Sequence, residues 1–184
     1  MRIIAGSARG ARIDAPDGRD TRPTLDRVRE NLFNMLQTRI TGSRVLDLFA
    51  GSGALSLEAV SRGADFAVLV DSSRKAQQVI QANVKKLKFE PSTRLIPQDW
   101  RDAVRRLKAE GESFDLIFLD PPYDMRDLEQ VFCSLTDLMA PDAWVILEHE
   151  AKADDIRTDE RFRPVKERSW GYCGVTIYEW GERQ

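Results

Sequence analysis

The chain has 184 residues, of which 42% are hydrophobic, and its formal net charge is -2 at pH 7. This length supports one well-buried core rather than two, so we expect a single domain spanning residues 1–184. No run approaches the roughly 18 apolar residues of a membrane helix, and the first ten residues lack the apolar stretch of a secretory signal. Cys133 and Cys173 are far apart with no histidine clustered around them, which indicates neither a zinc site nor a disulfide framework. We therefore expect a cytoplasmic protein with no membrane association and no bound metal.

The small net charge argues against a protein that coats nucleic acid, but the charge is unevenly distributed. Residues 1–44 contain nine arginines, no lysine and five acidic residues. Because the arginine guanidinium can donate two hydrogen bonds to one phosphate and can stack on bases, this excess of arginine favours contact with RNA. An ordinary solvated surface is the alternative interpretation. The candidate RNA-binding arginines of this segment are Arg2, Arg9 and Arg12.

Residues 1–42 are predicted to form a short extended arm followed by one helix. The helix begins near Thr24, a suitable N-cap residue, and ends near Gly42. Within it, apolar residues recur at helical spacing and form a single stripe. These residues are Val28, Leu32, Met35, Leu36 and Ile40. We expect the stripe to pack on the rest of the domain.

Residues 43–184 alternate between strand-like and helix-like segments, which we interpret as the catalytic core. Apolar runs of strand length lie at 44–49, 66–70, 93–97, 115–120 and 143–150. Helical patterns follow Gly53 and cover 73–87, 101–110 and 126–139. Strands apolar on both faces and separated by helices predict a doubly wound, Rossmann-like α/β fold. Segments 162–169 and 173–180 predict a hairpin, giving a mostly parallel seven-stranded sheet with an antiparallel C-terminal strand.

Open α/β sheets bind ligands at the carboxyl ends of their strands, and the first strand ends in a glycine-rich loop. Gly51 and Gly53 would allow the backbone to turn sharply and to approach a ligand closely. Asp71 ends the next strand, where a carboxylate can accept hydrogen bonds from both hydroxyls of a ribose. Both NAD and S-adenosylmethionine fit these features, and close packing of strand on helix also explains the glycines.

Two observations favour S-adenosylmethionine over NAD. The loop lacks the third glycine of the dinucleotide fingerprint, and the chain has little room for a second mononucleotide half. We expect Asp47 and the loop to hold the methionine end of the cofactor, Asp71 the ribose and Asp99 the adenine amino group, although Asp99 also suits a helix N-cap. The predicted cofactor-binding residues are Asp47, Phe49, Gly51, Gly53, Asp71, Ser72, Asp99 and Trp100.

The tetrapeptide Asp120-Pro121-Pro122-Tyr123 directly follows an apolar strand. An amino group on a nucleobase is a poor nucleophile because its lone pair is delocalised into the ring. If the Asp120 carboxylate and the Pro121 carbonyl each accept one N–H, the lone pair becomes localised and aimed. The prolines would present both acceptors rigidly, and Tyr123 would stack on an extruded base. The motif therefore predicts methylation of an exocyclic amine, with a tight strand-to-helix turn as the structural alternative.

The chain resembles the RsmD family, which methylates the N2 amino group of a guanine in 16S rRNA. The resemblance covers nearly the whole chain: RIIAG at the start, TRPT leading into DRVRE, then VLDLFAGSGALSLEA, FDLIFLDPPY and EHE. It implies a class I methyltransferase fold, S-adenosylmethionine as methyl donor, and the small ribosomal subunit or its assembly precursor as substrate. It also implies that Arg22 and Thr24 line the mouth of the active site, where a turn and a helix cap are the alternative roles. We expect a monomer.

Three other activities fit parts of the same pattern. An adenine-N6 DNA methyltransferase could use the Asp120 motif, but this chain lacks the extra length usually devoted to reading a DNA sequence. A protein glutamine methyltransferase more often carries asparagine at the position of Asp120. An NAD-linked oxidoreductase or a noncatalytic nucleotide-binding module would bind its nucleotide without recognising S-adenosylhomocysteine, so a binding measurement separates it from a methyltransferase.

Overall fold

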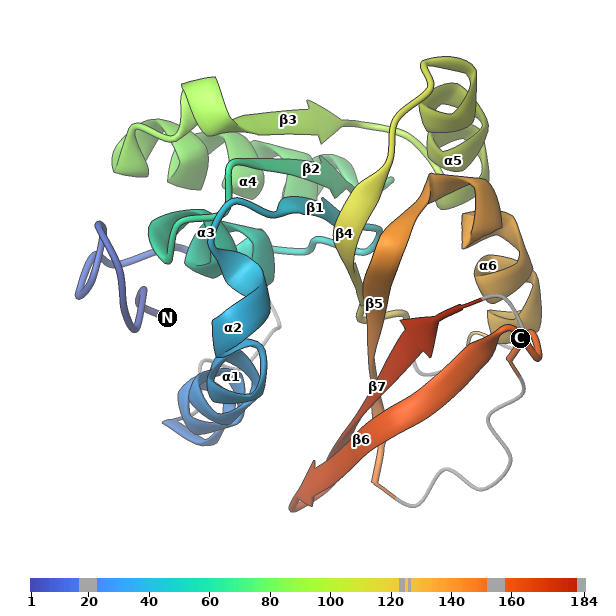
Figure 1. Cartoon of the computed structure of the whole chain (residues 1–184). Helices are drawn as coiled ribbons and strands as arrows, with labels where there is room; N and C mark the ends of the chain where they lie inside the picture. Colours follow the sequence, from blue (N-terminus) through green and yellow to red (C-terminus); the bar gives the residue numbers. More distant parts are fainter. Residues whose placement is uncertain (17–22, 123–124, 126, 152–157, 182–184) are drawn as a thin grey trace.

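The computed structural model describes residues 1–16, 23–122, 125, 127–151 and 158–181, with the side chains of residues 23–25 outside the description. It contains a seven-stranded sheet in the order β3-β2-β1-β4-β5-β7-β6. Strands β1 to β5 pair in parallel, whereas β7 pairs antiparallel with both β5 and β6 (Figure 1). The predicted mostly parallel sheet with an antiparallel C-terminal hairpin is therefore confirmed.

The strands are β1 (Arg44–Asp47), β2 (Phe66–Val70), β3 (Thr93–Ile96), β4 (Phe114–Leu119), β5 (Met139–Glu150), β6 (Phe162–Trp170) and β7 (Cys173–Trp180). The helices are α1 (Pro23–Met35), α2 (Gln37–Ile40), α3 (Ala54–Ser61), α4 (Arg74–Leu87), α5 (Trp100–Ala109) and α6 (Leu128–Leu135). Short 3-10 turns cover Glu90–Ser92 and Thr136–Leu138. None of the described helices has both the length and the apolar character needed to cross a bilayer.

Helices cover both faces of the sheet, as strands that are apolar on both faces require. Helices α1 to α4 pack on one face, and α5 and α6 pack on the other (Figure 1). Successive side chains of a strand point to opposite faces, so Leu116 and Phe118 of β4 join the α1 side while Ile117 and Leu119 join the α5 side. The same alternation decides on which face a residue just beyond a strand end lies.

The predicted helix from Thr24 to Gly42 is in fact two helices. Helix α1 begins at Pro23, so the assignment of Thr24 as N-cap is wrong and Thr24 lies in the first turn. Proline suits the first helical position because its missing N–H would have no intrahelical partner there. Leu36 separates α1 from α2. The apolar stripe nevertheless packs on the sheet, with Val28, Leu32, Leu36 and Ile40 buried in the core of the α1 face.

The boundary between α6 and β5 also differs from the sequence prediction. Helix α6 ends at Leu135, and a 3-10 turn leads directly into β5 at Met139 rather than at Ala143. Met139 pairs with Phe114, and an irregularity in register separates this pair from the pairing of Leu116. The intervening Ala140-Pro141-Asp142 has the composition of a turn, which explains why sequence patterns place the strand start too late.

The N-terminal arm is a closed loop, and the prediction of an extended arm is wrong. Arg2 and Arg12 form an antiparallel bridge, and the Ile3 N–H donates to the Ala11 carbonyl at 2.9 Å. Gly6 has φ +82°, and a Cβ at this position would lie 1.7 Å from the Ser61 carbonyl oxygen. Only glycine tolerates both the positive φ and this close approach, so the loop lies directly on the end of α3.

A buried carboxylate on α3 fastens the loop. Glu58 is fully buried. It accepts hydrogen bonds from the N–H groups of Ile4 at 2.8 Å and Ala5 at 3.0 Å, and from Arg62 Nε at 2.7 Å. These bonds satisfy backbone donors that have no partner in regular secondary structure. The position of the arm therefore follows the position of α3.

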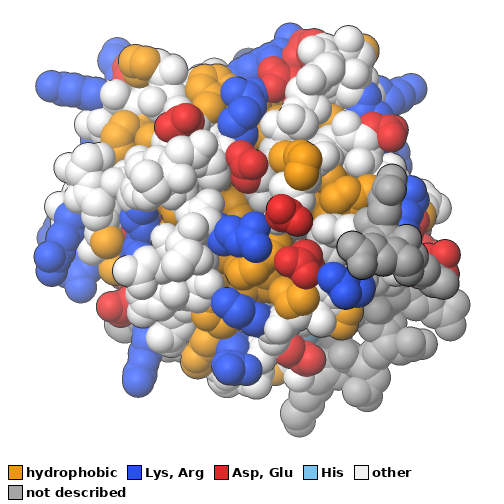
Figure 2. Space-filling model, in the orientation of Figure 1, with side chains coloured by type: hydrophobic (Ala, Val, Ile, Leu, Met, Phe, Trp, Pro, Cys, Tyr) orange, Lys and Arg blue, Asp and Glu red, His pale blue; other side chains and the backbone are white. Residues whose placement is uncertain are grey.

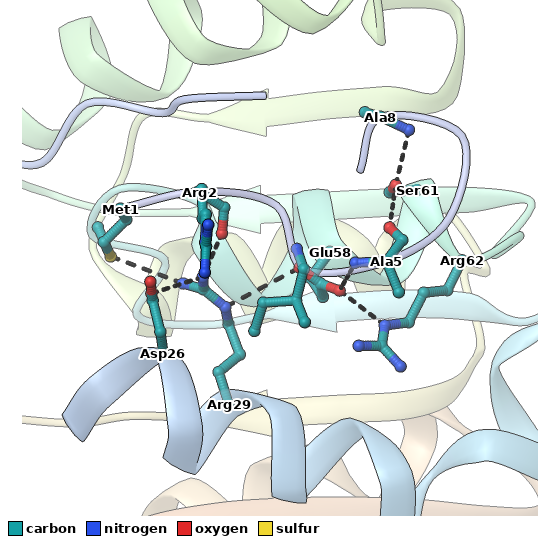
Figure 3. Close-up of polar contacts among 10 residues, drawn as sticks. Met1, Arg2, Ala5, Ala8, Asp26, Arg29, Glu58, Ser61 and Arg62 are labelled. Carbon is teal, nitrogen blue, oxygen red and sulfur yellow. Dashed lines mark hydrogen bonds and ion pairs between the residues drawn. The ribbon is translucent and has the colours of Figure 1, made fainter. Parts of the chain in front are cut away.

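Helix α1 joins the same cluster through Arg29 (Figure 3). Arg29 Nε lies 3.9 Å from Glu58 Oε2, and Arg29 Nη2 donates to Asp26 Oδ1 at 3.0 Å and to the Arg2 carbonyl. Arg29 Nη1 also lies 3.6 Å from the Met1 sulfur. Burial lowers the pKa of Arg29, and the carboxylates of Asp26 and Glu58 oppose that shift. The arm, α1 and α3 are thus held together by one partly ionic cluster.

We predict that Glu58→Ala destabilises the protein by about 3–5 kcal/mol, because it leaves buried N–H groups and two arginines without their shared carboxylate. Urea unfolding measures the loss, and hydrogen exchange at the amides of Ile3, Ile4 and Ala5 should accelerate more than exchange in the sheet. Glu90→Ala, an exposed change, is the matched control. Equal stability of the Glu58 variant and the control would contradict the role given to Glu58.

Candidate active site

The strand order reverses at β1, which lies between β2 and β4. In open α/β sheets a crevice forms at such a reversal, outside the carboxyl ends of the strands. Asp47 is the last residue of β1 and pairs with Phe118, and Asp120 follows the end of β4. The two carboxylates therefore belong to the same edge of the sheet.

The glycine-rich loop turns the chain from β1 into α3. Gly51 and Gly53 have φ +57° and +77°, values that glycine adopts without strain. The Gly51 N–H donates to Asp71 Oδ2 at 2.8 Å, and the Ser73 N–H donates to Asp71 Oδ1 at 2.8 Å. Each oxygen of Asp71 keeps a further lone pair, so the carboxylate can accept more hydrogen bonds while it holds the loop in place.

Two neighbouring cavities open at this edge. The larger, of about 260 Å³, is bordered by six of the predicted cofactor residues together with Asp120 and Pro122. These six are Phe49, Gly51, Asp71, Ser72, Asp99 and Trp100. The smaller, of about 120 Å³, is bordered by Asp47, Phe49 and Asp120 and lies against Arg29 of α1. Because Phe49 and Asp120 border both cavities, the two cavities adjoin, and the glycine-rich loop and the Asp120 motif contribute to the walls of both.

Asp99 lies at the start of α5 and at the wall of the larger cavity. Its carboxylate accepts the N–H of Arg101 at 2.9 Å and so caps α5, and it also borders the larger cavity. Trp100 beside it is buried, and its indole Nε1 has no hydrogen-bond partner among the described residues.

Asp47 is a buried acid of the site with a strongly raised pKa. It is 1% exposed, and its Oδ2 accepts a hydrogen bond from Ser56 Oγ at 3.0 Å. Oδ1 is buried without a partner among the described residues. Burial is the main cause that raises the pKa of Asp47 to about 7; the Ser56 hydrogen bond opposes this shift, and the negative charges of Asp120 and Asp71 contribute to it. A buried acceptor without a partner is costly, and a cationic ammonium group would satisfy it.

The structure does not bring every predicted residue into the cavities. Gly53 and Pro121 border neither of the two. The missing side chain of Gly53 instead makes room for Leu69 and Leu57, which a Cβ would meet at 3.0 and 3.4 Å. Arg22, Tyr123 and the side chain of Thr24 lie outside the described residues.

The three candidate RNA-binding arginines lie on the surface of the arm. Arg2, Arg9 and Arg12 are exposed, and within the described ranges none of them forms an ion pair. Elsewhere many arginines do, such as Arg94 with Glu110 at 2.7 Å. On the face in Figure 2 acidic and basic side chains are interspersed. Arg2, Arg9 and Arg27 border a groove of about 460 Å³ between the arm and α1, and the acids Asp26 and Glu30 border it as well.

Sequence patterns missed part of the smaller cavity wall. Glu148 borders it from β5, and Met1 and Arg29 border it from the arm and α1. The alternation Trp144, Ile146, Glu148 along β5 could have revealed Glu148, because the first two are buried on the α1 face. Nothing local in the sequence signals Met1 or Arg29, since their position depends on the Glu58 cluster.

Comparisons with known proteins agree on one family. The family described as Conserved hypothetical protein 95 matches residues 1–179. The chain is 38% identical to Ribosomal RNA small subunit methyltransferase D of Escherichia coli K12 over 97% of this chain and 89% of that protein. The solved structure of yhhF from Escherichia coli superposes with a TM-score of 0.84 at 33% identity, covering 100% and 99% of the two chains. The crystal structure of SMU.776 complexed with SAH superposes with a TM-score of 0.72 at 16% identity, over 85% of this chain and 49% of that one, and so shows a shared fold.

The raised pKa of Asp47 predicts how stability depends on pH. The folded protein binds this proton with a pKa of about 7 instead of 3.8, so the free energy of unfolding falls as pH rises between these values and is level above them. Asp47→Asn removes this contribution. We expect the free energy of unfolding of wild type, relative to that of Asp47→Asn, to fall by on the order of a few kcal/mol between pH 4.5 and pH 8, as measured by urea unfolding. A difference that stays constant with pH would show that Asp47 titrates normally.

Proposed function

The chain belongs to the RsmD family, as the family match over residues 1–179 and the 38% identical relative show. We propose that it transfers a methyl group from S-adenosylmethionine to the exocyclic N2 of a guanine in 16S rRNA. The observation that carries this proposal is that Asp120 borders two adjoining cavities, both of which the glycine-rich loop also borders. The substrate class rests on the small-subunit rRNA methyltransferase named among the relatives. The guanine N2 position rests on the family resemblance.

The larger cavity suits the adenosyl part of the cofactor and Asp47 suits its methionine end. Asp71 would accept hydrogen bonds from the ribose hydroxyls, and Asp99 would accept one from the adenine amino group, with Phe49, Ser72 and Trp100 around them. The buried Asp47 Oδ1 without a described partner fits the cationic methionine ammonium. When bound, S-adenosylmethionine supplies an electrophilic methyl group on a sulfonium.

Asp120 and Pro121 orient the amine. The Asp120 carboxylate and the Pro121 carbonyl each accept one N–H, so the nitrogen lone pair is localised and aimed at the methyl group. Pro122 stiffens the turn, and Tyr123 is assigned to stacking on the extruded base from the sequence motif alone. The methylated amine is first formed as a strong acid, so its surplus proton passes to Asp120 or to water.

The substrate would be the small ribosomal subunit or its assembly precursor, bound by a monomer. Residues 1–184 form one methyltransferase domain in this proposal, with 43–184 as the catalytic core. The arm supplies Arg2, Arg9 and Arg12 for phosphate contacts, because these arginines are exposed and form no ion pair with a described residue. Arg22 and Thr24 are assigned to the mouth of the site from the family resemblance.

Product analysis tests the proposed reaction. The protein is incubated with labelled methyl donor and, in separate reactions, with unmodified small subunits, free ribosomal RNA, duplex DNA and a release factor. We expect N2-methylguanosine after digestion of the small-subunit reaction. N6-methyladenine from DNA or methylglutamine from the release factor would replace the proposal with one of the alternative activities, and binding of NAD without S-adenosylhomocysteine would exclude a methyltransferase.

Two aspartate variants separate catalysis from cofactor binding. Asp120→Ala should lower the rate of transfer by about 10²–10³-fold, because it removes an acceptor that acts on the reacting amine, while affinity for S-adenosylhomocysteine persists. Asp71→Ala should weaken that affinity by roughly tenfold or more, the effect of losing a charged acceptor. Calorimetry and single-turnover rates measure both, with the exposed Asp65→Ala as control. Normal turnover by Asp120→Ala would contradict the catalytic assignment.

A further inference from the structure

Three carboxylates converge on the smaller cavity from three adjacent strands. Asp47, Asp120 and Glu148 all border it. Asp47 ends β1, Asp120 directly follows β4, and Glu148 lies in β5, and these three strands are neighbours in the sheet. Leu119 pairs with Leu147 in parallel register, so the residues that follow them, Asp120 and Glu148, lie side by side at the carboxyl edge.

The strand alternation also places all three carboxylates on one face. Val45, Phe118 and Ile146 precede them by two positions, and all three are buried in the core of the α1 face. Because the side-chain period of a strand is two, Asp47, Asp120 and Glu148 point toward the same layer. Neighbouring parallel strands lie about 4.8 Å apart, so two such side chains can reach two atoms of one flat ring.

Glu148 is held in this position from the neighbouring hairpin. Its Oε1 accepts a hydrogen bond from the Sγ–H of Cys173 on β7 at 3.3 Å. Cys173 is buried, and burial raises the pKa of its thiol, with the negative charges of Glu148 and Asp120 adding to the shift. Cys173 therefore remains a neutral hydrogen-bond donor to Glu148.

We propose that Glu148 is the residue that selects guanine, by accepting the N1–H of the base while Asp120 and Pro121 hold the N2 amino group. This inference rests on the proposed function. Guanine carries N1–H and the N2 amino group next to each other on its Watson–Crick edge, and enzymes that extrude a base read this edge. An ionised carboxylate only accepts hydrogen bonds, so two neighbouring carboxylates match two neighbouring donors.

The same geometry rejects adenine. Adenine has an amino group for Asp120, but its ring N1 is an acceptor without hydrogen, so its lone pair would face the Glu148 carboxylate. An acceptor placed against a charged acceptor loses the hydrogen bond and leaves both groups unpaired, which discriminates strongly between substrates. A glutamine amide likewise lacks any group at the place of guanine N1–H.

The decisive probe is 2-aminopurine, which keeps the 2-amino group of guanine but has an unprotonated N1. Small subunits are reconstituted with 16S rRNA that carries 2-aminopurine at the guanine identified by product analysis. We expect wild type to prefer guanine over 2-aminopurine by about 10- to 100-fold in kcat/KM, the worth of a charged hydrogen bond. In Glu148→Gln this ratio should fall close to one, because the amide can either accept from guanine or donate to 2-aminopurine.

Matched variants separate recognition from structure. Glu150→Gln changes an exposed carboxylate two positions further along β5 and should keep the wild-type ratio. A merely structural role of Glu148 would lower both rates and leave their ratio unchanged, and that result would overturn the inference alone. If wild type methylates adenine or no guanine at all, the proposed function fails and the inference fails with it.

Discussion

Parallel pairing of β4 with β1 on one side and with β5 on the other is the constraint on which the site depends. Parallel strands end at the same edge, so Asp47 at the end of β1, Asp120 after β4 and Glu148 near the end of β5 lie close together. Desolvation makes this arrangement costly, since like charges and burial both disfavour ionised carboxylates. Asp47 shows that cost directly through its raised pKa. A fold that retains such a cluster at a strand-order reversal is arranged for a ligand with complementary donors and positive charge.

The glycine-rich loop and the Asp120 turn act as two rigid borders of that cluster. Asp71 fixes the loop through the Gly51 amide, and the prolines after Asp120 limit the backbone on the other side. Both borders are defined by backbone geometry rather than by long flexible side chains. Positioning of this kind costs little reorganisation during reaction, which is the property that methyl transfer to a weak nucleophile requires.

The N-terminal arm belongs to the site although it lies far from it in sequence. Glu58 fastens the arm to α3, and α3 begins directly after the glycine-rich loop. Asn83 of α4 connects the same parts, since its Nδ2 donates to the carbonyls of both Asp14 and Ser52. The surface of the arm is therefore joined by short hydrogen-bonded links to the glycine-rich loop that borders the two cavities.

The sequence by itself determined the order of strands and helices, the glycine-rich loop, and the motif around Asp120. These features are local: side-chain alternation, helical spacing and the backbone limits of glycine and proline act over a few residues. Only the tertiary structure decided that the arm closes into a loop, that the first helix is two helices, and that Gly53 serves packing. It alone placed Glu148 beside Asp120 and Arg29 beside Glu58. These placements depend on strand register and on hydrogen bonds between segments far apart in the chain, and no local pattern specifies which distant partner a side chain will meet.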